Sequence, residues 1–174
     1  MIVYLAGGMR SDWQERVKAA VPNHCYINPA QSGVKAPAQY TLWDMFGIER
    51  ADLLFVYIEK DNPSGIGAAF EIGYALGLGK RVILVDRRSP RDELFRRYTA
   101  IVHQAGPIML ETLNDGITML ESLARLDELV GWSPGQVEAK KIWGERLSKL
   151  FSLPRGEVDC ANPDTESTVW DVAR

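Results

Sequence analysis

One carboxylate stands in an unusual place in this sequence. Glu71 lies in the segment 62–85, NPSGIGAAFEIGYALGLGKRVILV, among glycine, alanine and aliphatic residues. The pattern indicates a buried helix followed by a buried strand, and an acid there is costly unless it is paired, faces a pocket or takes part in chemistry. Glu71 is therefore a candidate catalytic residue. The alternative is a structural acid that is hydrogen-bonded to Tyr4 or to loop amides.

A glycine-rich turn precedes the helix that carries Glu71. Ser64, Gly65 and Gly67 lie where free backbone N–H groups and the positive end of the helix favour an anion or a sugar hydroxyl oxygen. Gly7 and Gly8, after the first apolar run, would let a ligand approach the backbone closely. These five residues are candidate substrate-binding residues. Tight turns without a ligand are the alternative.

A second acid, Asp44, follows Trp43 in the segment YTLWDMFGIERAD. Two carboxylates that converge near a sugar suit glycosidic chemistry, because one attacks the anomeric carbon while the other handles the proton of the leaving group. The nucleophile must stay ionised, so a donor such as the Tyr4 hydroxyl would help it. Asp44 and Tyr4 are thus further candidate catalytic residues. A solvated surface position is the alternative for Asp44.

The elements that must position these residues alternate between short apolar runs and helix-length segments. The expected strands cover residues 2–7, 24–28, 52–59, 80–86 and 107–110. The expected helices cover residues 11–21 with Ser11 as N-cap, 40–51, 66–79, part of 87–98, and 112–126, while 31–39 is expected to be a loop. This alternation predicts an α/β fold, a parallel sheet with helices on both faces. Ligands bind such sheets beyond the carboxyl ends of the strands, which makes the candidate functional loops 6–12, 28–38, 59–66 and 86–92.

The chain has 174 residues, enough for one domain with a core and an extension. We predict a catalytic domain at residues 1–130 and a C-terminal helical extension at 131–174. We expect the extension to contain an amphipathic helix over 137–151 and to end in a polar tail that either is mobile or docks on a partner surface through Trp170.

Composition excludes several classes of function. The net charge of −3 gives no support for nucleic-acid binding. Cys25 and Cys160 lie far apart without a CxxC motif, and the only histidines are His24 and His103, so neither a metal site nor a cofactor is expected. The first ten residues hold too few apolar positions for a signal peptide or a membrane span. We therefore expect a cytoplasmic protein.

Three segments carry a resemblance to the nucleoside 2-deoxyribosyltransferase family. They are VYLAGG (3–8), WDMFGIERADLLFVYI (43–58) and GIGAAFEIGYALGLGKRVILV (65–85), in the order found in that family. The resemblance implies a flavodoxin-like, doubly wound, five-stranded parallel sheet with helices on both faces. It also implies that neighbouring subunits complete each active site, so that the protein is a homo-oligomer, a dimer or larger.

The same resemblance implies roles for the candidate residues. Glu71 matches the nucleophile that attacks C1′ of a 2′-deoxynucleoside and forms a deoxyribosyl-enzyme. Asp44 matches an acid that protonates or positions the base, and Tyr4 matches a tyrosine that holds the nucleophile. The expected substrates are a nucleoside or nucleotide and a free nucleobase.

The sequence departs from the transferases at one position of the expected sugar site. The transferases carry an aspartate about six residues before the nucleophile, where this chain has Gly65. The PSGIG turn is more similar to the related 5′-monophosphate N-glycosidases, which hold a phosphate there, and Arg87, Arg88 and Arg91 could add positive charge. The asparagine that a neighbouring transferase subunit supplies is not assigned here, although Asn114 lies in roughly that region.

Three functions remain open from the sequence. The first is a deoxyribosyltransferase of purine and pyrimidine salvage. The second is a hydrolase, a (deoxy)nucleoside 5′-monophosphate N-glycosidase, in which water takes the place of the acceptor base. The third is a non-catalytic nucleotide-sensing module. The joint presence of Glu71, Asp44 and Tyr4 favours an enzyme, since a binding module does not require it.

Overall fold

The computed structural model describes residues 1–61 and 65–130, with the side chains of 127–130 left out. The predicted extension at 131–174, with its helix over 137–151 and Trp170, lies outside the described residues.

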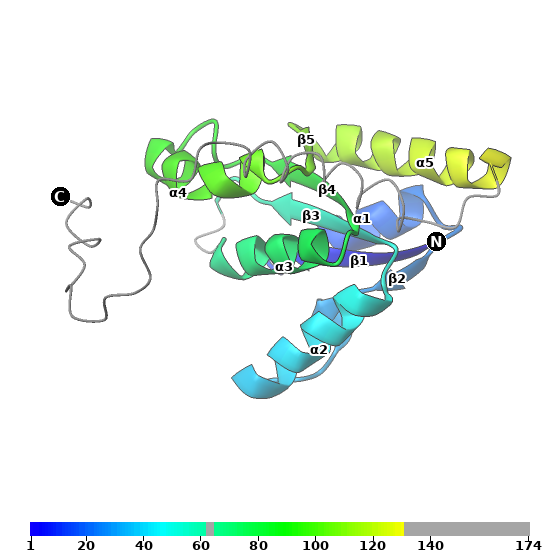
Figure 1. The fold of residues 1–174 in the computed structure, drawn as a ribbon, viewed down its shortest axis with the longest axis horizontal. Coiled ribbons are helices and arrows are strands. Elements are labelled where there is room, and N and C mark those ends of the chain that lie inside the picture. The colour runs from blue at the N-terminus through cyan, green and yellow to red at the C-terminus, as the bar shows by residue number, and fades with distance from the viewer. Residues whose placement is uncertain (62–64, 131–174) are drawn as a thin grey trace, which may run out of the picture. The chain divides into compact units, whose positions relative to one another are not determined.

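Five parallel strands form the centre of the described chain (Figure 1). They are β1 (Ile2–Gly7), β2 (Cys25–Ile27), β3 (Leu53–Ile58), β4 (Arg81–Asp86) and β5 (Ile108–Leu110). Their order in the sheet is β2-β1-β3-β4-β5, and every neighbouring pair is parallel. This is the flavodoxin-like order, whose direction of winding changes between β1 and β3. The predicted five-stranded parallel sheet is confirmed.

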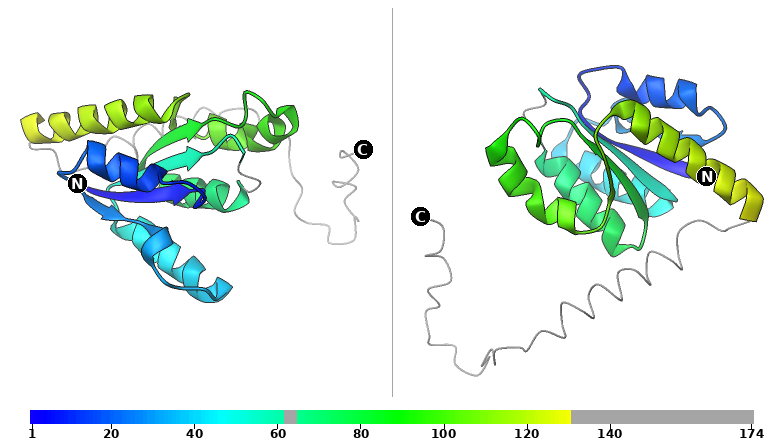
Figure 2. Two further views of the ribbon diagram at one scale, coloured as in Figure 1. Left: turned by 180° about the vertical axis from the view of Figure 1, so that it is seen from behind. Right: turned by 90° about the horizontal axis from the view of Figure 1, so that it is seen from above.

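Helices cover both faces of this sheet (Figure 2). The helices are α1 (Trp13–Ala20), α2 (Pro37–Arg50), α3 (Ile66–Gly77), α4 (Glu93–Gln104) and α5 (Leu113–Val130), with a short 3-10 turn at Pro29–Gln31. Helices α1 and α5 pack on one face, while α2, α3 and α4 pack on the other. The sheet is therefore doubly wound, as the sequence predicted.

The alternation of side chains along β1 decides which face each residue serves. Val3 and Leu5 are fully buried against α1 and α5, whereas Tyr4 and Ala6 are fully buried on the face covered by α2 and α3. Successive strand residues point to opposite faces, so both sides of β1 are apolar core. Tyr4 consequently lies beneath the two helices that carry Asp44 and Glu71.

Three helix boundaries differ from the predicted ones. The N-cap of α1 is Asp12 rather than Ser11, whose hydroxyl instead donates to Glu59. Helix α2 begins at Pro37, three residues earlier than predicted, because proline suits the first turn of a helix. Helix α4 begins only at Glu93, because the carboxylate of Asp92 caps it by accepting the N–H of Phe95 at 2.9 Å.

Gly7 ends β1 in a conformation that other residues rarely adopt. Its φ is 132°, and a Cβ at this position would lie 2.2 Å from the carbonyl oxygen of Tyr57 on β3. The close approach of the two strand ends therefore depends on glycine. Gly7 thus lies at the carboxyl end of β1, beside β3, where the direction of winding of the sheet changes.

We predict that Gly7→Ala lowers the free energy of unfolding by about 2–4 kcal/mol, because the new methyl group strains φ and collides with backbone. Urea unfolding measures the loss. Gly73→Ala is the matched control: it lies in α3 with open space around its Cβ, and it should be neutral or stabilise by up to about 1 kcal/mol. Equal stability of Gly7→Ala and wild type would contradict the prediction.

Candidate active site

A cavity of about 400 Å³ opens at the carboxyl ends of β1 and β3. Its volume suits a small-molecule ligand, and its place at the winding reversal is where open α/β sheets bind ligands. Its lining comes from β1 and the loop after it, the 29–34 segment, β3, α2 and α3. The lining residues are Gly7, Met9, Pro29, Ser32, Val34, Tyr40, Thr41, Asp44, Ile58, Gly65, Gly67, Ala68, Phe70 and Glu71.

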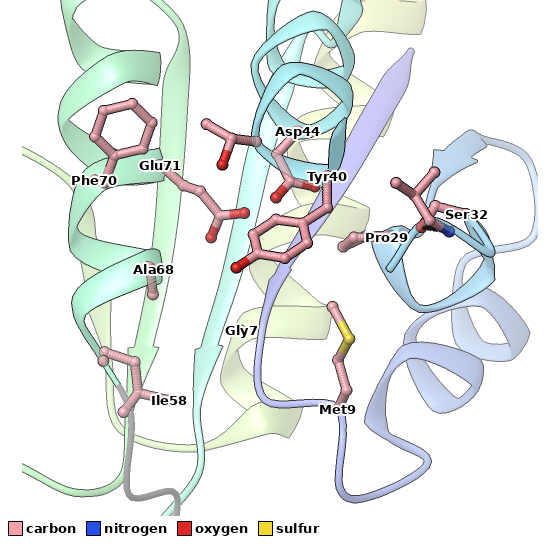
Figure 3. Close-up of a pocket in the computed structure, with 14 residues that line it drawn as sticks. Gly7, Met9, Pro29, Ser32, Tyr40, Asp44, Ile58, Ala68, Phe70 and Glu71 are labelled. Atoms are coloured by element: carbon pink, nitrogen blue, oxygen red, sulfur yellow. Dashed lines mark hydrogen bonds between the residues drawn. The ribbon is translucent and has the colours of Figure 1, made fainter. Parts of the chain in front are cut away.

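Two acids from neighbouring helices face this cavity. Figure 3 shows the carboxylates of Glu71, on α3, and Asp44, on α2, pointing into the same space. Both side chains are partly buried. Among the described residues that line the cavity, no side chain is basic. The cavity therefore favours a positive charge that develops on a bound ligand.

The hydroxyl of Tyr4 joins the two acids from below. It lies 2.8 Å from Asp44 Oδ1 and 3.2 Å from Glu71 Oε1. Those two oxygens are therefore at most about 6 Å apart, the sum of the two distances. Three residues that are far apart in the sequence, and that the sequence singled out for chemistry, thus meet at one point.

The ring of Tyr4 reaches this point because α2 carries a glycine above it. A Cβ on Gly47 would lie only 2.8 Å from Cε2 of Tyr4 and 3.2 Å from Cγ2 of Ile27. The ring also packs beside Trp43, with 6.3 Å between the ring centroids. The position of the hydroxyl is therefore fixed by core packing, and Gly47 is a positioning residue that the sequence analysis missed.

The two acids hold protons more tightly than carboxyls in water. Burial raises the pKa of Glu71 from its ordinary value of 4.5 to about 7; the charge of Asp44 adds to the rise and the Tyr4 hydrogen bond opposes it. Burial also raises the pKa of Asp44, again against the hydrogen bond from Tyr4. The pKa of Tyr4 is raised by burial and by both carboxylates, so the phenol stays neutral. The group therefore retains a proton near neutral pH.

The other predicted binding residues divide into three groups. Gly7, Gly65 and Gly67 line the cavity. Gly8 is buried outside this lining, and its carbonyl accepts from Trp13 Nε1 at 2.6 Å. Ser64 lies outside the described residues.

None of residues 86–92, predicted as a functional loop of the same crevice, lines this cavity, although Asp86 pairs in the sheet with Ile58 of the lining. Asp86 accepts hydrogen bonds from Ser89 Oγ at 2.5 Å and lies 2.9 Å from Nε2 of His103, beside a second pocket. Arg88 is paired with Asp92 at 2.9 Å. None of the three arginines of this loop lines the cavity that holds Glu71.

Several lining residues were not predicted as site residues, although the sequence carries a signal for them. Tyr40 and Thr41 precede Asp44 by four and three residues, and Ala68 precedes Glu71 by three. Residues at these spacings share one face of a helix, so the positions of the two acids predict that these neighbours line the same cavity.

The described residues contain no group of three or more His, Cys, Asp or Glu side chains placed to hold a metal ion. Within that same part of the chain, no helix is long and apolar enough to span a membrane.

We predict that Glu71→Gln stabilises the protein at pH 8. Because the pKa of Glu71 is raised in the folded state, the folded protein binds this proton more tightly, and its stability falls as pH rises from about 4.5 to about 7. Removing the charge should recover up to about 3 kcal/mol at pH 8 and nothing at pH 4. Thermal unfolding at both pH values measures the difference. Glu111→Gln, at an exposed position, is the control; a gain of the same size at pH 4 would contradict the prediction.

Comparison with known proteins places this site in a family. The model of the family described as "Nucleoside 2-deoxyribosyltransferase like" matches residues 1–88, just over half of the chain and all three residues around the Tyr4 hydroxyl. No curated protein matches the chain. A conserved protein from Enterococcus faecalis V583 has the same fold, with a TM-score of 0.52 and 16% identity over 70% of this chain and 98% of that chain. A CMP N-glycosidase from Clostridium botulinum gives a TM-score of 0.47 and 22% identity over the same shares. By the match to its family model, this chain belongs to the nucleoside 2-deoxyribosyltransferase-like family.

Proposed function

We propose that this chain is an enzyme that cleaves the N-glycosidic bond of 2′-deoxynucleosides and transfers the deoxyribosyl group to another nucleobase. The observation that carries the proposal is the pair of partly buried acids bridged by the Tyr4 hydroxyl. A module that only senses nucleotides has no need for two acids without a basic partner among the described lining residues. Family membership supports the same class of substrate.

Glu71 is the nucleophile in this proposal. Retaining glycosidases hold their two carboxyl groups about 5–5.5 Å apart, whereas inverting enzymes need about 6.5–9.5 Å to admit a water. The upper bound of about 6 Å between the oxygens of Glu71 and Asp44 favours the shorter class. Glu71 would attack C1′ and form a glycosyl-enzyme, while Asp44 would give its proton to the departing base.

Substrate binding in this proposal uses the backbone of two glycine-rich segments. Gly65 and Gly67 surround the start of α3, where free N–H groups face the cavity side of the sheet. Gly7, at the end of β1, lets the ligand lie against the strand. Gly8 and Ser64 are proposed to support these two turns. Metal and organic cofactors are not part of the proposed chemistry.

Hydrolysis of a nucleoside 5′-monophosphate is the second candidate function. It is favoured by Gly65, which stands where the transferases place an aspartate that would repel a phosphate. The two functions share Glu71 and the glycosyl-enzyme and differ in the acceptor, base or water.

The test incubates the protein with each 2′-deoxynucleoside and each 5′-monophosphate, with and without a second base, and separates the products by chromatography. We expect a new deoxynucleoside only when the acceptor base is present, and a loss of at least about 10³-fold in Glu71→Ala. Glu111→Ala, at an exposed site outside the cavity lining, is the control and should keep full activity. A 2-fluoro substrate should add one sugar mass to wild type and none to Glu71→Ala.

Other outcomes of this experiment change the conclusion. Base released from monophosphates regardless of acceptor would establish the hydrolase instead. Substrates left intact by wild type and Glu71→Ala alike would favour the sensing module.

We also propose that the protein is a homo-oligomer in which α2 packs against a second copy. Residues 37–42, the first turn and a half of α2, are exposed throughout, and this part of the helix extends beyond the sheet (Figures 1 and 2). Leu42 and Phe46 on α2 are 69% and 57% exposed, and Phe70 at the rim of the cavity is 53% exposed. An exposed apolar group of this kind marks an interaction surface.

Sedimentation tests the oligomer. We expect Phe46→Glu to shift the protein to monomers and to lower turnover, because the surface beside the cavity would lose its cover. Ile101→Glu, on α4 and 77% exposed, is the matched control and should leave the oligomer intact. A wild-type monomer, or dissociation caused only by Ile101→Glu, would contradict this interface.

A further inference from the structure

The hydroxyl of Tyr4 has more acceptors than its one proton can serve. It contacts Asp44 at 2.8 Å and Glu71 at 3.2 Å, and the side chain is fully buried. A phenol donates only one hydrogen bond, so one of the two contacts needs a proton from a carboxyl group. The chain of contacts is satisfied when Glu71 is protonated and donates to Tyr4 while Tyr4 donates to Asp44.

We propose that Tyr4 relays one proton between Glu71 and Asp44, so that the nucleophile becomes ionised in the same movement that protonates the acid for the departing base. This inference rests on the proposed glycosyl transfer. It assigns Tyr4 a part in the reaction beyond holding Glu71 in place.

The step conserves protons and electron pairs. The proton of Glu71 passes to the Tyr4 oxygen, the proton of Tyr4 passes to Asp44, and Asp44 gives its proton to the base nitrogen. The C1′–N bond breaks with its electron pair going to that nitrogen, while an oxygen of Glu71 bonds to C1′. In the second half, the incoming base or water bonds to C1′ and gives a proton to Asp44, while the C1′–O ester bond breaks with its electron pair returning to Glu71. Asp44 then passes its proton to Tyr4 as Tyr4 passes its own to Glu71.

The electrostatics of the site support this direction of movement. With its pKa raised to about 7, Glu71 holds its proton about half of the time at neutral pH. Positive charge that develops at C1′ favours the ionised form of Glu71, and charge that develops on the base favours a protonated Asp44. The pKa of Tyr4 is raised further from neutrality, so a phenolate does not form as an intermediate. The proton that leaves Glu71 and the proton that reaches Asp44 therefore move together.

The packing of the ring supports a relay of fixed geometry. Gly47 and Trp43 hold the ring from the side of α2, and the strand register fixes its backbone between β2 and β3. The hydroxyl oxygen therefore stays within hydrogen-bond distance of both acids. A residue that only held the nucleophile would need the contact with Glu71 and not the shorter one with Asp44.

Tyr4→Phe, assayed on two substrates, tests the relay. One is a 2′-deoxynucleoside, whose base must be protonated to leave, and the other is 4-nitrophenyl 2-deoxyriboside, whose nitrophenolate leaves without a proton. We expect kcat/KM to fall by about 10²–10³-fold on the nucleoside and by less than about 10-fold on the nitrophenyl substrate. Asp44→Asn measures how far kcat/KM on the nucleoside falls when the acid itself is absent. The double variant of Tyr4→Phe with Asp44→Asn should lose no more kcat/KM than Asp44→Asn alone.

In wild type, kcat/KM should depend on pH in different ways for the two substrates. Above about pH 7, Glu71 loses the proton to be relayed, so kcat/KM on the nucleoside should fall. The nitrophenyl substrate needs only ionised Glu71, so its kcat/KM should rise to about pH 7 and then level. A proton inventory in mixed H₂O and D₂O should curve for the wild-type nucleoside reaction, because two protons move.

Equal losses of Tyr4→Phe on both substrates, or a linear wild-type inventory, would overturn the relay. The inventory decides the matter even if Tyr4→Phe does not fold. Failure of the proposed function looks different, because wild type would then turn over neither substrate.

Discussion

The rest of the site depends on one buried hydroxyl. Tyr4 belongs to the core face of β1, yet its oxygen contacts the acids of both α2 and α3. A buried polar atom is costly without partners, and α2 and α3 each present one to this hydroxyl, Asp44 and Glu71. This requirement ties the register of two helices to one strand position. Stability of the core and geometry of the site thus come from the same contacts.

The flavodoxin-like sheet supplies the other half of the arrangement. Reversal of winding between β1 and β3 leaves the carboxyl ends of these strands uncovered by a crossover helix. Gly7 lets the two strand ends approach, and α3 starts directly beyond β3 with small residues towards the cavity. The acids therefore lie beside an open space and not inside solid core, which explains why a carboxylate can persist in the apolar sequence around Glu71.

The sequence predicted the strands and the three residues around the hydroxyl because both are marked by strong local patterns. Apolar runs of strand length leave little choice of fold, and an acid in such a run stands out. Gly47 could not be found in this way, since its role depends on which side chain of another element lies opposite, here the ring of Tyr4. The loop at 86–92 does follow the carboxyl end of a strand, as predicted, but the contacts of Asp86 with Ser89 and His103 depend on α4 and could not be predicted from the sequence.

The choice between base and water as acceptor depends on what covers the cavity. The proposed glycosyl-enzyme at Glu71 would react with whichever nucleophile reaches C1′ first, and water is far more concentrated than any base. The cavity is bordered by Tyr40 and Phe70, both exposed, and by the free first turns of α2. In one subunit nothing among the described residues closes over these groups. In the proposed transfer, a cover over the cavity would keep water from C1′, and the proposed second copy against α2 would supply one, so oligomerisation and transfer should be gained or lost together.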